Sequence, residues 1–493
     1  MDNSSWLADR PLVHFAQLKG LAIGRAFIVR SILMTTGLTL GLSILLSQAG
    51  AQNPPASRTD ESPVVLVQPS GPGQATPPIT ITLQDALERA RKNDLGFLTA
   101  VGDAKSAHED RLQSRNAMLP SLSESTQFLN TQGNGTTPEG RFVTNDGVHV
   151  YREWAVLHQD LSPNTYLRTG YHHAWAAEAI AKAKLEIARR GLTVTVTKTY
   201  YALGVAQRKY ATAQQALDQG KHFFDITQAL ERSGQIAHSD AVKAEIQYRQ
   251  QEQAFDEAKL AMEGARLDLA VLLFPTLNEN FSIVDDLDSA VALPAFAEVE
   301  SMAGRENPDL RVATETLRQA NLDVSGARGA FLPSITIDTD YGIESNDFAL
   351  HSIWKSHPDK GHLPMLGYFL TASMNIPVWD WGTLRSKLHQ TEYRQEQARV
   401  GLSQAQRQVL SNLYRSYNEA AVARSAVDSS RHTADLAAES QRLIGLRYQA
   451  GESTALEVVD AVTTLTLARN AYDDSEARYR VALATLQTLT GSF

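Results

Sequence analysis

At residues 331–343 the sequence reads FLPSITIDTDYGI, and here its pattern changes from that of a helix to that of a strand. From Ile335 to Ile343 every second residue is apolar, aromatic or Thr, and the residues between them are Thr, Asp and Gly. Residues 364–377 alternate in the same way. This period of two predicts strands of about ten residues, long enough to cross a bilayer, although a soluble antiparallel sheet shows the same alternation.

The chain repeats itself. Leu332-Pro333-Ser334 has an earlier copy in Leu119-Pro120-Ser121, about 210 residues upstream, and Gly451 follows Gly234 at a similar interval. We therefore expect a first repeat at 80–274, a linker at 275–295 and a second repeat at 296–493. The expected strands are 120–130 and 148–161, then 333–343 and 364–377, with polar loops at 131–147 and 344–363. The apolar face of the first pair is assigned to Leu122, Phe128, Val148, Val150, Trp154 and Val156.

Three long windows without proline predict long helices. No proline occurs from 79 to 119, from 164 to 274 or from 378 to 493, and these windows are rich in Ala, Leu, Gln, Glu and Arg. Gly234 and Gly451 interrupt the two longest windows and predict hairpin turns at 232–240 and 448–456. The first arm of each hairpin would be roughly 100 Å long, which exceeds a single globular core.

The second arm of each hairpin carries a seven-residue repeat. Large residues recur every seven positions from Val458 to Leu486, with mostly small residues such as Ala461 between them, and the matching positions of the first repeat begin at Ala241. This spacing predicts a left-handed coiled-coil seam along which the helices approach closely.

The N-terminal residues predict export. Arg25 and Arg30 precede the apolar run 32–46, and a small-residue cleavage site follows at residues 49–51, so residues 1–51 are interpreted as a signal peptide. The alternative is a membrane anchor, but the run is shorter than the roughly 20 residues that a bilayer requires. Residues 52–79 are Pro-rich and predict an extended tether.

Composition excludes several classes of protein. The 493-residue chain contains no Cys, which removes disulfides, thiolate metal sites, Cys nucleophiles and the lipid-bearing cysteine of a lipoprotein. Its formal net charge of −9 argues against a nucleic-acid partner. The sequence has no HExxH, P-loop or GxSxG motif, so we expect neither enzymatic activity nor a cofactor or metal site.

Four strands cannot close a membrane barrel, because open sheet edges leave unpaired backbone groups in hydrocarbon. Three chains with four strands each would form a 12-stranded barrel. The expected fold is therefore mainly α with a small β part: a trimeric α-barrel of long coiled-coil helices, topped by a shared 12-stranded transmembrane β-barrel, with a two-fold internal repeat. The alternative is a periplasmic coiled-coil adaptor or scaffold without a pore, which would contain no strands of bilayer length.

In these features the chain resembles the TolC family of outer-membrane efflux proteins. The resemblance covers about residues 80–491 and is carried by ITLQDAL at 81–87, the two Leu-Pro-Ser segments, NIPVWDWG at 375–382, RYQAGEST at 447–454 and VVDA at 458–461. It implies a homotrimer in the outer membrane, in contact with its lipid, with a long periplasmic tube. The resemblance further implies a passive exit duct for efflux or type I secretion. Its partners would be a periplasmic adaptor (a membrane fusion protein) and an inner-membrane transporter of the RND, ABC or MFS type.

The resemblance also implies an acidic gate at the periplasmic entrance, formed by Glu457 and Asp460. Their spacing independently places both acids on one side of a helix, away from the centre of the Val458/Ala461 seam. Three copies would form two stacked rings of negative charge that favour cations. The alternative is a solvated helix start, where acids favour the helix dipole.

Two further sets of residues follow from the resemblance. Tyr448 and Asp240 match one bond that locks neighbouring hairpins, and Ser239 matches one partner of a second bond. That second bond is expected to be missing or replaced, because Ser453 occupies the position of its arginine. The two turns, with Gly234, Gln235, Gly451 and Glu452, match the surface on which the adaptor docks, where the neighbours of the glycines would make the contacts.

Overall fold

The computed structural model describes residues 78–130, 149–277, 280–289, 291–346, 348–357, 361–450 and 452–491. The predicted signal peptide, almost all of the predicted tether and the loop at 131–147 lie outside these residues. Within the described ranges, no helix combines the length and the apolar character needed to cross a membrane.

Each half of the chain contains the same succession of long elements. The first half contains β1 (Ile79–Ile81), α2 (Leu83–Asn93), α3 (Leu95–Asn116), β2 (Ser121–Asn130), β3 (His149–Asp160), α4 (Pro163–Tyr166), α5 (Thr169–Arg232) and α6 (His238–Leu273). The second contains β4 (Phe281–Ile283), α7 (Phe296–Glu306), α8 (Pro308–Gly329), β5 (Ser334–Ser345), β6 (His351–His357), β7 (Gly361–Pro364), β8 (Leu366–Asn375), α9 (Thr383–Gln449) and α10 (Ala455–Thr490).

Helix lengths confirm the two-fold internal repeat. α2 and α7 have 11 residues each, α3 and α8 have 22, and α6 and α10 have 36. The long arms α5 and α9 have 64 and 67 residues, which at 1.5 Å per residue is about 100 Å. The repeats also share a tertiary contact: the side-chain amide of Asn93 donates to the carbonyl of Leu273, and that of Asn307 donates to the carbonyl of Leu489.

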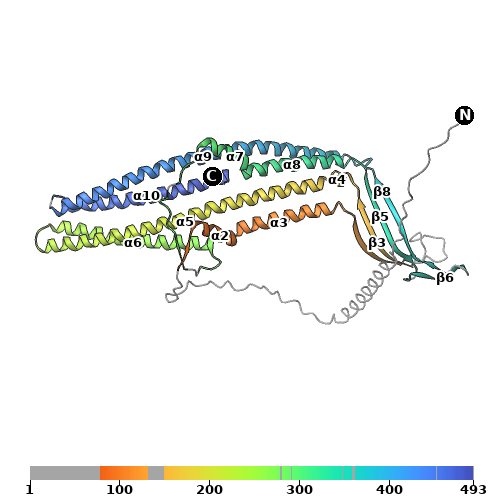
Figure 1. Cartoon of the computed structure of the whole chain (residues 1–493), viewed down its shortest axis with the longest axis horizontal. Helices are drawn as coiled ribbons and strands as arrows, with labels where there is room; N and C mark the ends of the chain where they lie inside the picture. Colours follow the sequence, from red (N-terminus) through yellow and green to blue (C-terminus); the bar gives the residue numbers. More distant parts are fainter. Residues whose placement is uncertain are drawn as a thin grey trace, which may run out of the picture. The chain divides into compact units, whose positions relative to one another are not determined.

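The helices lie side by side in a single layer (Figure 1). Next to the sheet, the order of neighbours is α3, α5, α8 and α9; toward the hairpin turns it is α6, α5, α10 and α9. The helices α6 and α9 therefore form the two lateral edges of the half that ends in the turns.

The predicted coiled-coil seams are buried or half-buried. Along α10 the buried seam positions are Ala461, Leu465, Ala468, Ser475, Tyr479, Ala482, Leu486 and Leu489. In α6 the seam begins with Ala241 and Ala244, which are 6% and 1% exposed. The repeat of small side chains allows the close helix approach that the sequence predicts.

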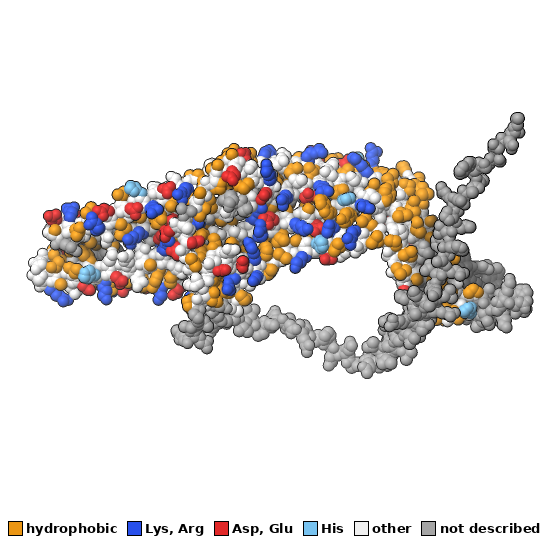
Figure 2. Space-filling view, viewed as in Figure 1, with side chains coloured by type: hydrophobic (Ala, Val, Ile, Leu, Met, Phe, Trp, Pro, Cys, Tyr) orange, Lys and Arg blue, Asp and Glu red, His pale blue; other side chains and the backbone are white. Residues whose placement is uncertain are grey.

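Four antiparallel strands form one sheet in the order β2-β3-β5-β8. The strands have 10, 12, 12 and 10 residues, close to the length needed to cross a bilayer. Ile335 is opposite Met374 and Tyr341 is opposite Tyr368, so the alternating apolar residues of β5 and β8 share one face. Hydrophobic side chains gather over this sheet, whereas charged side chains are spread over the helices (Figure 2).

One expectation for the first pair of strands is wrong. Phe128 pairs with Tyr151, but Trp154 pairs with Ser125, so Leu122 and Phe128 lie on one face while Val150, Trp154 and Val156 lie on the other. Val148 lies outside the described residues. The physical reason lies on neighbouring strands: Trp154 is opposite Gly342 of β5, where a Cβ atom would lie 1.9 Å from the carbonyl oxygen of Glu153, so this glycine lets the two backbones approach closely. The Trp154 ring contacts Phe369 of β8 at 3.9 Å between centroids, which holds the tryptophan on the face opposite to Phe128.

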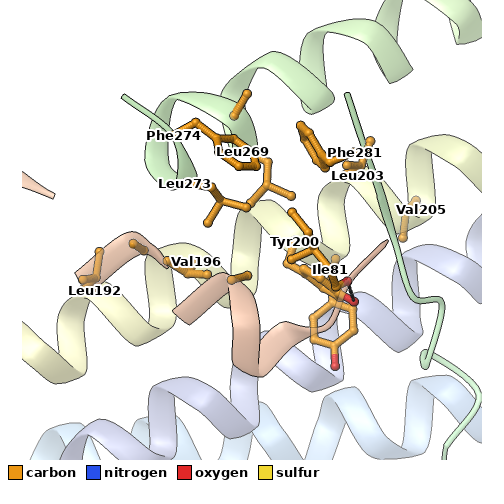
Figure 3. Packing of buried hydrophobic residues seen from close by; sticks show 14 of the residues in the cluster. Ile81, Leu192, Val196, Tyr200, Leu203, Val205, Leu269, Leu273, Phe274 and Phe281 are labelled. Atoms are coloured by element: carbon orange, nitrogen blue, oxygen red, sulfur yellow. Dashed lines mark hydrogen bonds between the residues drawn. The ribbon is translucent and has the colours of Figure 1, made fainter. Parts of the chain in front are cut away.

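The largest apolar core lies midway along the helices, where α2, α5 and α6 meet the short parallel pair β1–β4 (Figure 3). Ile81, Leu203 and Leu269 are at most 1% exposed there. Tyr200 is also buried, and its hydroxyl donates to the carbonyl of Val284 at 2.7 Å. This core attaches the segment between the two repeats to the side of the long helices.

Candidate functional site

The two hairpin turns end their long helices in the same way. After α5, the amide of Gln235 donates to the carbonyl of Leu230 at 2.9 Å and the amide of Gly234 to that of Glu231 at 2.8 Å. After α9, the amide of Glu452 donates to the carbonyl of Arg447 at 2.8 Å. These are Schellman-type caps, in which the residue at C′ adopts a left-handed conformation. Gly234 has φ +75°. Gly451 lies outside the described residues.

The two predicted gate acids lie at the start of α10. Thr454 caps the helix by accepting a hydrogen bond from the amide of Glu457 at 3.3 Å, and the Glu457 carboxylate accepts one from the Ser453 hydroxyl at 2.7 Å. Glu457 and Asp460 are both exposed, whereas Ala461 faces the seam and is 6% exposed. The acids therefore project away from the seam between α9 and α10, where they can meet water.

The predicted lock residues come close together without bonding directly. The Tyr448 ring of α9 packs on Phe223 of α5, with centroids 5.4 Å apart. Burial, followed by the nearby negative charge of Asp240 on α6, raises the pKa of Tyr448. Within the described part of this protomer, Tyr448 and Asp240 share no hydrogen bond. Asp240 lies 4.0 Å from the ammonium group of Lys243.

The second bond, which was expected to be missing or replaced, does not join Ser239 and Ser453 within the described residues. Ser239 is exposed at the start of α6. Ser453, which occupies the position of the missing arginine, instead donates to Glu457 within its own helix cap. The Ser453 hydroxyl therefore orients the Glu457 carboxylate within the helix cap.

Sequence reasoning missed a charged cluster in the middle of the long helices. Arg208 of α5 donates to Asp285 at 2.6 and 2.9 Å, to Asp288 at 2.9 Å and to Asp473 of α10 at 3.1 Å. Glu476 lies 3.5 Å from the same guanidinium. We call these five residues the Arg208 cluster. It joins both repeats to the segment between them.

Burial and charge oppose each other in this cluster. Burial raises the pKa of both Asp473 and Glu476, although Arg208 counteracts the effect. Burial would lower the pKa of Arg208, but its hydrogen bonds to Asp285, Asp288 and Asp473 raise that pKa overall. The only sequence signal was the acidic run at 285–288 between two helices. The partners of that run are distant in the chain.

A groove of about 1230 Å³ lies between α5, α6, α9 and α10. Ala is the most frequent residue of its lining, for example Ala202 and Ala206, and polar or charged residues such as Gln250 make up most of the rest. Lys209 also lines the groove and pairs with Asp474 at 2.7 Å, next to Arg208 but on another face of α5. The groove is thus separate from the Arg208 cluster and is lined by small and polar side chains.

Comparisons with known proteins agree on one family. Residues 300–492 match the family model "Outer membrane efflux protein". The cation efflux system protein CusC of Escherichia coli K12 is 24% identical over 312 residues, which span 61% of this chain and 64% of CusC. The alignment therefore spans less than two thirds of that relative.

Solved structures share the fold over a longer range. The structural match to the outer membrane channel CmeC of Campylobacter jejuni covers 83% of this chain and 85% of the CmeC chain, with a TM-score of 0.70 and 17% sequence identity. The open state of the MtrE outer membrane channel of Neisseria gonorrhoeae covers 83% and 89%, with a TM-score of 0.70 and 23% identity. Residues 300–492 thus match the outer membrane efflux protein family model, and the described residues have the fold of the CmeC and MtrE outer membrane channels.

Proposed function

We propose that this chain is the outer-membrane exit duct of a tripartite efflux or type I secretion system and that it works as a homotrimer. One observation carries the proposal: a single chain joins an open four-stranded sheet with an apolar face to helices about 100 Å long. The sheet would span the outer membrane and the helices would extend into the periplasm. Cargo would then cross both without contact with the lipid.

The edges of the sheet support a shared barrel. Among the described residues, β2 and β8 each pair with a strand on one side only. In hydrocarbon, each unsatisfied backbone group on the other side would cost several kcal/mol. Pairing β8 of one protomer with β2 of the next satisfies these groups, and three protomers close a 12-stranded barrel.

The edges of the helical layer support the same assembly. On α6, Ile246, Leu260 and Leu267 follow a seven-residue spacing and are 52%, 72% and 51% exposed. On α9, Tyr393, Val400 and Tyr414 follow the same spacing and are 70%, 54% and 48% exposed. Each series is a coiled-coil stripe that no described part of the same chain covers. Packing α6 of one copy against α9 of the next would close a tube.

The turns at the far end of the tube would form its entrance. Glu457 and Asp460 of three copies would make two acidic rings that favour cations. Tyr448, Asp240 and Ser239 would contribute to closure between hairpins. Adaptor contacts would come from Gln235 and Glu452, beside Gly234 and Gly451. The transporter in the inner membrane, of the RND, ABC or MFS type, would select the cargo, and the duct itself would conduct passively.

A scaffold without a pore remains the competing assignment from the sequence. Strands of 10 and 12 residues with an apolar face argue against it, because a soluble scaffold does not need bilayer-length strands.

Conductance in planar bilayers tests the proposal. The purified mature protein should add discrete steps of uniform size that favour cations, whereas detergent alone and heat-unfolded protein should add none. Protein that is folded by circular dichroism, enters liposomes and gives no conductance steps under any applied voltage would contradict an exit duct.

A further inference from the structure

An interior glycine of α5 forms a socket for a side chain of α6. Gly220 is buried, and a Cβ atom at this position would lie 1.7 Å from Oε1 and 2.8 Å from Cδ of Gln251. Gln251 occupies a seam position and is 8% exposed. Its Oε1 is buried and has no hydrogen-bond partner within the described part of the chain. The amide group of Gln251 thus fills the space that an alanine side chain would take.

The other hairpin fills the matching positions differently. Ala437 and Ala468 follow Gly220 and Gln251 at the same interval by which Gly451 follows Gly234. They are 6% and 8% exposed and belong to one buried cluster. One hairpin therefore has a large side chain in a glycine socket where the other has two alanines. The second hairpin therefore serves as an internal comparison, because its seam has alanine at both of these positions.

The Gly220–Gln251 pair is expected to be less stable than a pair of alanines at the same positions. Glycine inside a helix is less favourable than alanine, and a buried amide oxygen without a partner loses its hydration. The alanine pair avoids both costs. Residues that break a local rule in this way often serve a purpose other than stability, and a polar residue in a coiled-coil seam is known to fix the alignment of helices.

We propose that Gln251, seated on Gly220, is a positioning lock that fixes the height and rotation of α6 on α5 and thereby holds Asp240 beside Tyr448. If α6 slid along α5 by one helical turn, Ala216 or Phe224 would lie opposite Gln251 in place of Gly220. Both residues have side chains that would occupy the space now filled by the Gln251 amide. Gln251 lies roughly 16 Å along α6 from Asp240, so a shift at the lock is transmitted along one rigid helix. The consequence for the gate rests on the proposed function, but the lock itself does not.

Disulfide trapping tests the lock directly, because the chain has no cysteine of its own. Thr227 and Ala244 lie two turns closer to the hairpin turn than Gly220 and Gln251, and both are buried on the same seam. The pair T227C/A244C would report the native alignment. The pairs T227C/A241C and T227C/Y248C would report shifts of about one turn in either direction.

We expect the native pair to oxidise at least tenfold faster than the shifted pairs in the wild-type background. In G220A/Q251A, which copies the alanine pair of the other hairpin, this ratio should fall at least threefold while the melting temperature does not decrease. G220A alone should also lower the ratio, because the added methyl group displaces the flexible end of Gln251. An unchanged ratio in G220A/Q251A would overturn the lock.

The reciprocal exchange is the matched control. A437G/A468Q should raise the ratio of native to shifted trapping in the second hairpin, measured with I444C/A461C against I444C/V458C. A lower or unchanged ratio would contradict a lock that depends on the pair itself.

Bilayer conductance then tests the link to the gate. G220A/Q251A should raise the residual conductance of the closed duct about threefold. If trapping shifts but the residual conductance does not, the lock is retained and its role at the gate is overturned. If no variant conducts, the proposed function fails, and the trapping result still decides the lock.

Discussion

Glu457 and Asp460 lie at the start of a packed helix, but their side chains take no part in its packing. Ala461 is buried in the seam, whereas both acids are exposed on the other side of α10. The Glu457 carboxylate is also oriented by the Ser453 hydroxyl at 2.7 Å. An acid in this position carries its charge without a burial cost, so its repetition around a three-fold axis would set the electrostatic potential of the entrance.

Neutralising these acids should weaken cation binding at the entrance. We expect E457Q/D460N to raise the divalent-cation concentration that halves the conductance by about tenfold, which corresponds to about 1.4 kcal/mol of binding free energy. Conductance titrations with Mg²⁺ would measure this. The matched control is D103N/E109Q, which removes two exposed acids from α3, far from the turns. Equal block in the wild type and E457Q/D460N would exclude an acidic gate at these residues.

Gly234 is required for its backbone conformation rather than for space. Its φ of +75° disfavours any residue with a Cβ atom, although no atom lies within 4 Å of where that Cβ would be. We expect G234A to lower the free energy of unfolding by about 1 kcal/mol. G234N should lose less, because Asn tolerates the left-handed region. Thermal unfolding in detergent would rank the variants, and equal stability of all three would refute a strained cap.

The Arg208 cluster links α5, α10 and the segment between the two repeats in the middle of the molecule. A single guanidinium bonds to the segment between the repeats through Asp285 and Asp288 and to α10 through Asp473. Arg480 of α10 adds a hydrogen bond to the carbonyl of Ser289 at 2.6 Å. These bonds connect elements that the helix seams alone would leave independent.

Loss of Arg208 should destabilise the protein in a pH-dependent way. Burial raises the pKa of Asp473 and Glu476, so these groups hold a proton to higher pH in the folded state than in the unfolded state. Their contribution to stability is therefore lost as the pH rises through the raised pKa. In the wild type, Arg208 offsets this loss. We expect R208M to lower the free energy of unfolding by about 3 kcal/mol at pH 7 and by clearly less near pH 4.5.

Denaturation at the two pH values would measure this difference. The control is K209M, which removes the neighbouring ion pair with Asp474, a half-exposed partner. That pair should contribute less than about 1 kcal/mol at either pH. If R208M were equally destabilised at pH 4.5 and pH 7, the ionised carboxylates would not be the cause.

Sequence patterns that lie within one element were sufficient to predict that element. Contacts between residues that are distant in the sequence could not be predicted in this way. Proline-free windows and heptads predict α5, α6, α9 and α10, because these signals lie within each helix. The face of β3 was mispredicted because the Trp154 ring contacts Phe369, a residue on another strand. The Arg208 cluster was missed for the same reason, since Arg208 and Asp473 are 265 residues apart in sequence.

In the part of the chain that the structure describes, both the sheet and the helical layer have edges without a partner. The sheet ends in β2 and β8, and the helical layer ends in α6 and α9 with exposed apolar stripes. A chain that exposes such stripes along a helix of 36 residues is expected to bury them against another chain. The alternation of apolar and polar residues could predict that the sheet must close into a barrel with strands of other chains. The number of protomers was inferred from the number of strands per chain and from the resemblance.

A charge on one of these stripes should separate the protomers without unfolding them. Leu260 is 72% exposed in the protomer, so L260E places no buried charge in an isolated chain. In the proposed trimer the same carboxylate would be buried and unpaired, at a cost of several kcal/mol. Light scattering in detergent should show a smaller particle with unchanged helix content. K259E, at the neighbouring exposed position, should remain assembled.

Electron microscopy of the mature, detergent-extracted protein tests the central claim most directly, because the architecture can be recognised without knowledge of the cargo. We predict hollow particles with three-fold symmetry and a helical tube roughly 100 Å long, as the lengths of α5 and α9 require. Solid rods, or single protomers without a lumen at the same protein concentration, would contradict an outer-membrane duct.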